Sequence, residues 1–94
     1  MKKIVEIEYV GIEDIQEITD DAYALMRLGH YVNVEMLNLR HDDVAMVNVA
    51  IRLGGWDATG SNDYSFRFYM TDNSEDVKIM NECKNSIKNL LPRG

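Results

Sequence analysis

The sequence has little of what would cross-link a chain or anchor it in a membrane. Its 94 residues contain one cysteine and one proline. A single cysteine excludes an internal disulfide and a cysteine-based zinc site. No apolar run approaches the ~18 residues that a membrane-spanning helix needs. The start, Met1-Lys2-Lys3-Ile4-Val5-Glu6, has a glutamate where a signal peptide requires an apolar stretch. We therefore expect a cytoplasmic protein.

Basic residues are scarce. Ten Lys and Arg stand against 16 Asp and Glu, which gives a formal net charge of −6. Nucleic acids and anionic membranes bind proteins through basic faces, so direct binding to either is not expected. The length and an apolar content of 46% fit one globular domain spanning residues 1–94. No catalytic motif is recognisable, and we predict neither an enzyme nor a cofactor or metal site.

The hydrophobic pattern predicts an α+β fold. Apolar residues recur at helical spacing over residues 12–28, and Gly29 is suited to ending that helix. A second apolar helical stripe follows Asp72-Asn73-Ser74-Glu75, whose residues favour a helix start. Alternation of apolar and polar residues predicts strands over 2–10, 31–40, 44–53 and 64–71.

These elements give the order β-α-β-β-β-α. The connections His41-Asp42-Asp43 and Gly54–Asp63 are short enough for hairpins, so the sheet should be mostly antiparallel and four-stranded. Two amphipathic helices on one face complete a two-layer sandwich. The first strand could lie next to the strand that follows it in sequence, or at the outer edge beside the last strand. The open face is predicted to carry Asn33, Glu35, Asn48, Arg52, Arg67 and Tyr69, with Glu6 and Glu8 of the first strand as further candidates.

The helix–three strands–helix portion resembles a double-stranded-RNA-binding domain in the order of its elements. Such domains depend on a basic cluster at the start of their last helix. Here Ser74-Glu75-Asp76 occupies that position, followed by Lys78. Two acids at this point would repel an RNA phosphate, so the sequence does not predict RNA binding.

The predicted helix over residues 12–28 gathers carboxylates on the side away from its apolar stripe. Standard helix geometry places five acids within an arc of about 120°: Glu13, Asp14, Glu17, Asp20 and Asp21. Like charges four residues apart cost a few tenths of a kcal/mol per pair. Three interpretations stay open: a solvated face, which is favoured, a docking surface for a basic partner, and metal binding. The spacing of these acids does not match a calcium-binding EF-hand loop.

The Gly54–Asp63 connection holds the only tryptophan. Trp56 could pack back on the core and fix the loop, or point outward as an interface anchor, since tryptophan is over-represented among binding hot spots. Asp57 and Asp63 in the same loop would suit a basic partner surface.

Two other groups carry chemistry that could be reactive. His41 with Asp42 and Asp43 could form a base and its orienting acids, although these residue types also favour turns. Cys83 lies on the apolar stripe of the second predicted helix, and we predict a buried thiol without a catalytic role.

Taken together, these features favour a small acidic, non-enzymatic protein-interaction module. Its carboxylates would occlude a Lys/Arg-rich partner surface, including one that normally binds nucleic acid. In size and charge the chain is similar to small inhibitors from phages and mobile elements, including anti-CRISPR proteins. The predicted partner-binding residues are Glu13, Asp14, Glu17, Asp20, Asp21, Trp56 and Asp57. The alternative is a structural or assembly protein that forms a homodimer or larger homo-oligomer through its sheet.

Overall fold

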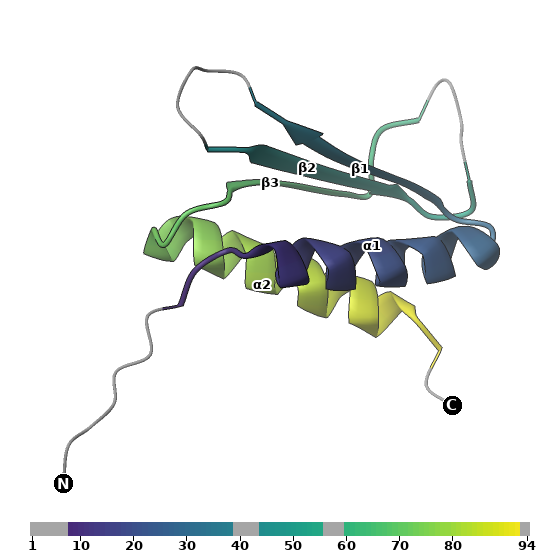
Figure 1. Cartoon of the computed structure of the whole chain (residues 1–94). Coiled ribbons are helices and arrows are strands. Elements are labelled where there is room, and N and C mark those ends of the chain that lie inside the picture. The colour runs from purple at the N-terminus through teal and green to yellow at the C-terminus, as the bar shows by residue number, and fades with distance from the viewer. Residues whose placement is uncertain (1–7, 39–43, 56–59, 93–94) are drawn as a thin grey trace, which may run out of the picture.

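The computed structural model describes residues 8–38, 44–55 and 60–92. This part of the chain forms two layers, a three-stranded antiparallel sheet and a pair of helices on one side of it (Figure 1). The elements in chain order are α1 Ile12–Arg27, β1 Tyr31–Leu37, β2 Met46–Arg52, β3 Tyr64–Tyr69 and α2 Ser74–Leu90. The α+β class and the helices on one sheet face agree with the prediction.

The sheet is a meander in the order β1-β2-β3. Val34 pairs with Val49, and Val49 pairs with Phe66 in the next strand, so residues of one parity share a face across all three strands. That face carries the buried residues Val32 and Phe68 and lies against the helices. The register places the predicted polar set on the opposite, open face: Asn33, Glu35, Asn48, Arg52, Arg67 and Tyr69.

Both helices begin with satisfied backbone donors. The Gly11 N–H donates to Asp14 Oδ2 at 2.9 Å at the start of α1, and the Glu75 N–H donates to Asn73 Oδ1 at 2.9 Å at the start of α2. Such caps stabilise a helix because its first N–H groups have no partner within the helix. After α1 the chain reverses at Gly29, whose φ of 94° favours glycine and confirms its predicted role.

The core lies between the two layers. Each helix contributes four buried side chains: Ile15, Ile18, Ala22 and Leu25 from α1, and Val77, Met80, Cys83 and Ile87 from α2. The central strand supplies Val47, Val49 and Ile51, all almost fully buried. α1 packs against β1, α2 packs against β3, and the helices also pack against each other. Because the described part of the chain buries no polar or charged residue, this core is purely apolar.

The predicted β-α-β-β-β-α order is not confirmed, because the described residues have the order α-β-β-β-α and a sheet of three strands. Residues 2–7 of the predicted first strand lie outside the described ranges, and Glu8–Val10 are not in a strand. The Val10 N–H donates to the Thr71 carbonyl at 2.9 Å, just beyond β3. The next N–H, that of Gly11, already caps α1. One such bond does not make a ladder, so the alternation before Gly11 was a weak signal for a strand.

The remaining predicted strands are present but shorter. The turn predicted at His41-Asp42-Asp43 lies outside the described residues, as do positions 56–59 of the longer connection. Within the described ranges, neither helix is both long enough and apolar enough to cross a membrane.

Removing one methylene from the core should cost more than removing it from the surface of the same helix. Ile18 is 1% exposed and Ile12 is 52% exposed. We expect Ile18→Val to lower the free energy of unfolding by about 0.5–1.5 kcal/mol, and Ile12→Val by less than about 0.5 kcal/mol. Urea denaturation of both variants at one low protein concentration measures the difference. Equal losses would show that α1 does not bury Ile18 as described.

Candidate interaction surface

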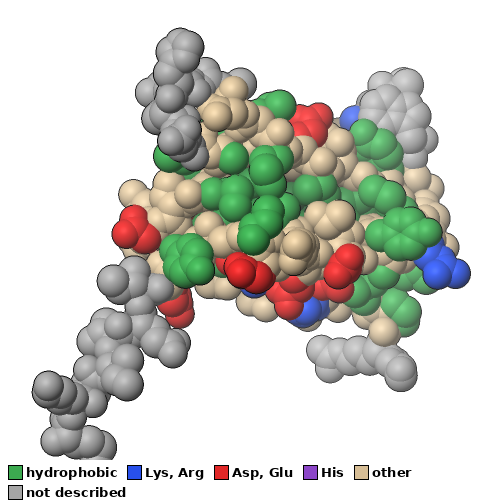
Figure 2. All heavy atoms as spheres, in the orientation of Figure 1, with side chains coloured by type: hydrophobic (Ala, Val, Ile, Leu, Met, Phe, Trp, Pro, Cys, Tyr) green, Lys and Arg blue, Asp and Glu red, His purple; other side chains and the backbone are tan. Residues whose placement is uncertain are grey.

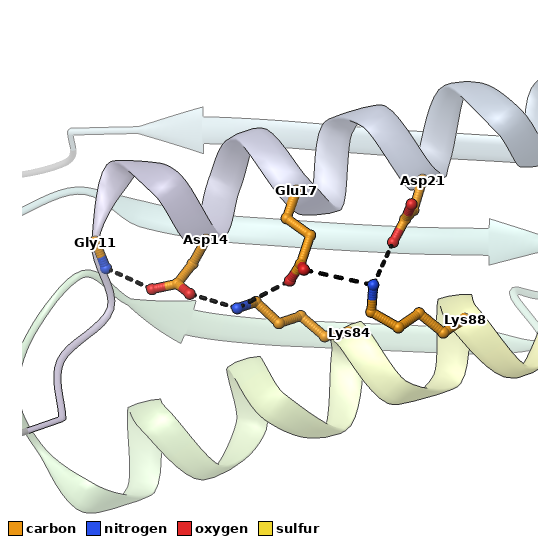
Figure 3. Close-up of polar contacts among 6 residues, drawn as sticks. All are labelled: Gly11, Asp14, Glu17, Asp21, Lys84 and Lys88. Atoms are coloured by element: carbon orange, nitrogen blue, oxygen red, sulfur yellow. Dashed lines mark hydrogen bonds and ion pairs between the residues drawn. The ribbon is translucent and has the colours of Figure 1, made fainter.

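Three of the predicted docking acids lie between the helices. Asp14, Glu17 and Asp21 line the side of α1 that faces α2, where they meet Lys84 and Lys88 (Figure 3). Lys84 Nζ contacts Asp14 Oδ1 and lies 3.0 Å from Glu17 Oε2. Lys88 Nζ lies 3.4 Å from Glu17 Oε1 and 3.3 Å from Asp21 Oδ2. Glu17 therefore bridges the two lysines. Acidic and basic side chains alternate along the line of contact between the helices, which is here called the seam.

Lys84 lowers the pKa values of the two acids that it contacts, Asp14 and Glu17. The hydrogen bond from Lys84 is the main reason why the pKa of Glu17 lies below its ordinary value. Partial burial acts to raise the pKa of Asp14, but the hydrogen bonds from Lys84 and Gly11 and the charge of Lys84 together lower it. In turn, Asp21 and Glu17 raise the pKa of Lys88. Asp14, Glu17 and Lys88 are each held in the charged form by their partners.

This arrangement accounts for most of the acidic arc on α1. Like charges at Glu17 and Asp21 repel within one helix, but Lys88 from α2 contacts both of them and offsets that repulsion. Glu13 and Asp20 are exposed, and neither makes an ion pair with another described residue. Three of the five acids thus join the helices, and Glu13 and Asp20 are the two that a partner could reach without breaking an ion pair.

A concave acidic region lies at the start of α1, on its α2 side. One cleft of about 330 Å³ is lined by Glu8, Tyr9, Glu13, Asp14, Val77, Met80 and Asn81. A second cleft, of about 650 Å³, shares Glu8, Val77 and Asn81 with the first and continues along α2 to Asp72, Ser74, Lys78, Glu82 and Asn85. The two adjoining clefts together are here called the acidic clefts. They contain five carboxylates and a single lysine, with apolar side chains at their base.

Metal binding and thiol chemistry can both be assessed in the described part of the chain. In the described ranges, no group of three or more His, Cys, Asp and Glu side chains could hold a metal ion. Cys83 is fully buried, as predicted, and burial raises the pKa of its thiol to about 12. A protonated, inaccessible thiol is a poor nucleophile. His41 and its neighbouring acids lie outside the described residues.

The structure divides the predicted partner-binding residues. Glu13 and Asp14 line the acidic clefts, whereas Glu17 and Asp21 lie in the seam between the helices. Asp20 lies elsewhere on the exposed side of α1. Trp56 and Asp57 lie outside the described residues.

Sequence reasoning missed the contribution of Glu8, Tyr9, Asp72 and Glu82 to the clefts. The alternation over residues 2–10 assigns Glu8 to a strand, and the motif at Asp72 indicates only the start of a helix. The high density of acids before Arg27 is a signal for Glu8, but it does not extend to Asp72 or Glu82.

The sequence matches no known protein-family model and no curated protein. Function must therefore be inferred from the geometry of the chain itself.

The seam between the helices should make stability depend on pH in the acid range. Asp14 and Glu17 have lowered pKa values in the folded protein, so their contribution is fully present above their ordinary pKa near 4. It is lost as the pH falls through the lowered values. We expect Lys84→Met to cost about 1 kcal/mol at pH 7 and to flatten the decline in stability between about pH 5 and 3.

Lys78→Met is the matched control, since Lys78 is an exposed lysine of α2 that makes no ion pair with a described residue. Urea titrations at several pH values give the free energy of unfolding as a function of pH. For this control, the slope of that plot in the acid range should equal the wild-type slope. An unchanged slope in Lys84→Met would contradict the described ion pairs.

The buried thiol gives a second check. We expect Cys83 to react with an aromatic disulfide reagent at least about a hundredfold more slowly than a free cysteine, because reaction requires local or global opening. The rate should rise with urea in parallel with unfolding. Rapid modification of the native protein would contradict the burial of this residue.

Proposed function

We propose that the chain is a non-enzymatic protein-interaction module that binds a basic segment of a partner protein through the acidic clefts. The observation that carries this proposal is the concave region in which Glu8, Glu13 and Glu82 surround an apolar floor that includes Val77 and Met80. A flat acidic surface attracts cations without selecting their shape. A cleft with acidic walls and an apolar floor selects a chain segment that combines lysines or arginines with apolar side chains.

The charges of the region favour this kind of partner. Glu8, Glu13, Asp72 and Glu82 are exposed acids, and the one basic residue that lines the clefts is Lys78. Clefts lined by charge of one sign concentrate oppositely charged ligands and speed their association. Tyr9, which is 60% exposed, stands at the same place and offers an aromatic surface on which an arginine could stack.

By covering a basic segment of its partner, the chain could inhibit that partner without catalysing a reaction. A partner that uses this segment to hold nucleic acid would lose that contact while the complex persists. The chain would then be an inhibitor by occlusion, which is the role indicated by its acidity and small size. Long-range attraction would set the association rate, and contacts with Tyr9, Val77 and Met80 would slow dissociation.

A pair of double variants tests the acidic clefts against charge in general. Glu8→Gln with Glu13→Gln removes two cleft acids, and Asp20→Asn with Glu75→Gln removes two exposed acids that do not line the clefts. Both variants change the net charge equally. A nuclease-treated lysate is passed over each immobilised protein, and a retained partner is then purified for titration calorimetry. We expect the cleft variant to weaken binding by about tenfold or more, and the control to bind as wild type does.

Three outcomes would contradict the proposal. Equal loss of affinity in both variants would point to net charge alone. Loss of the partner on nuclease treatment would point to nucleic acid as the bridge. If the immobilised protein retains nothing from the lysate, the lysate contains no protein that binds it as proposed.

A further inference from the structure

The two edges of the sheet are not equivalent. At the β3 edge, the Tyr69 N–H donates to Asp76 Oδ1 at 3.1 Å, and the Thr71 carbonyl accepts from the Val10 N–H. Each edge strand carries one charged side chain, Arg67 in β3 and Glu35 in β1, so the capped backbone groups are what distinguish the two edges. Capped backbone groups and charge are the usual means by which an edge is kept from pairing with another chain. Within the described residues, no strand pairs with the other edge, β1.

The hydrogen-bond pattern shows which groups β1 presents. The Met70 N–H donates to the Ala45 carbonyl, so odd-numbered residues of β2 direct their backbone groups toward β3. Even-numbered residues of β2 therefore face β1, where they pair with Tyr31, Asn33, Glu35 and Leu37. The backbone groups of the intervening residues, Val32, Val34 and Met36, point away from the sheet. Each of these residues offers one donor and one acceptor along a seven-residue strand without proline, lysine or bulge.

Exposed apolar side chains lie beside this edge. Met36 of β1 is 46% exposed although it belongs to the helix-facing side of the sheet. On α1, which packs against β1, Ile12 is 52%, Tyr23 is 62% and Met26 is 45% exposed. Helix geometry puts these three on the side of α1 away from α2. Figure 2 shows hydrophobic side chains gathered across the middle of one face, between the sheet above and the helices below.

We propose that β1 pairs with β1 of a second copy of this chain, in antiparallel orientation about a two-fold axis at Val34. The occupant is a second copy because the strand is complementary to itself in this register. Val34 faces its own counterpart, and Val32 faces Met36 of the second copy. On the open face, the Asn33 Nδ2 donates to Glu35 Oε1 of its own strand at 2.9 Å. This pair would lie opposite the same pair of the second copy, so that each carboxylate faces an amide. The axis at Glu35 would instead set two carboxylates against each other, which is unfavourable.

The same axis brings the apolar side of α1 against its counterpart. α1 has 16 residues and β1 has seven, so each spans roughly 23 Å and their midpoints lie near each other. A two-fold at the middle of β1 therefore runs close to the middle of α1. Ile12 at the start of one helix then comes beside Met26 at the end of the other. The result is one continuous sheet with two central helices, and no unpaired β1 edge remains.

Charge at position 33 tests both the dimer and its register. Asn33→Lys sets a lysine opposite Glu35 of the second copy, and Asn33→Glu sets a carboxylate there. Ser65 shares the row of Asn33 on the open face but lies in β3, so Ser65→Glu is a control of equal charge at the other edge. Sedimentation equilibrium should give a mass twice the 10.8 kDa of the chain. We expect Asn33→Lys to lower the dimer dissociation constant about threefold to tenfold, Asn33→Glu to raise it by a similar factor, and Ser65→Glu to leave it unchanged.

The possible contrary results are distinct. A monomer up to millimolar concentration would overturn the proposal. So would a dimer in which Asn33→Glu and Ser65→Glu have equal effects, or an assembly that grows beyond two copies. Circular dichroism of each variant establishes that the fold is retained. The test is independent of the acidic clefts, because position 33 does not line them.

Discussion

The structure depends on burying one apolar face of a three-stranded sheet beneath two helices that lie side by side. The central strand contributes Val47, Val49 and Ile51 to that face, and no single helix could cover it together with both outer strands. α1 takes the side of β1, and α2 takes the side of β3. The flanks of the helices are thereby brought together, and whatever side chains stand on those flanks must be compatible. The facing sides are compatible because acidic and basic side chains alternate between them, in the order Asp14, Lys84, Glu17, Lys88 and Asp21.

The acidic arc of α1 shows where sequence reasoning ends. Helix geometry correctly placed Asp14, Glu17 and Asp21 on one side of a helix, because that relation spans only a few residues. It could not supply Lys84, which lies 70 positions away from Asp14 in the sequence. In the sequence of one helix, a run of acids without lysines suggests a surface that binds a cationic partner. In the fold, lysines of α2 form ion pairs with three of the five acids. The two acids outside these ion pairs are Glu13 and Asp20, both exposed.

The elements that were predicted well are those fixed by local pattern. Period and capping placed α1 to within a residue of its end, and alternation sorted the sheet residues onto the correct faces. The predicted first strand failed on the described residues because alternation gives a conformation but not a pairing partner. The row formed by Leu37, Met46 and Tyr69 on the open face was likewise beyond the sequence, since it exists only through the register of three strands. The acidic clefts need the same long-range information, because Glu8 and Glu82 meet only after folding.

The two proposed surfaces lie on different sides of the fold, and this has a consequence for affinity. The acidic clefts lie at the start of α1 and along α2 from Ser74 to Asn85, and α2 packs beneath β3. The self-pairing edge is β1, on the other side of the sheet. Pairing through β1 therefore leaves the clefts of both copies open and directs them away from the axis. A dimer would present two acidic sites at a fixed separation. Against a partner with two basic segments at a matching distance, the second binding event becomes intramolecular, and avidity rises without any new contact. A partner with a single basic segment would gain no affinity from the dimer. The affinity for a partner with two basic segments, divided by the affinity for a partner with one, therefore reports whether both surfaces act together.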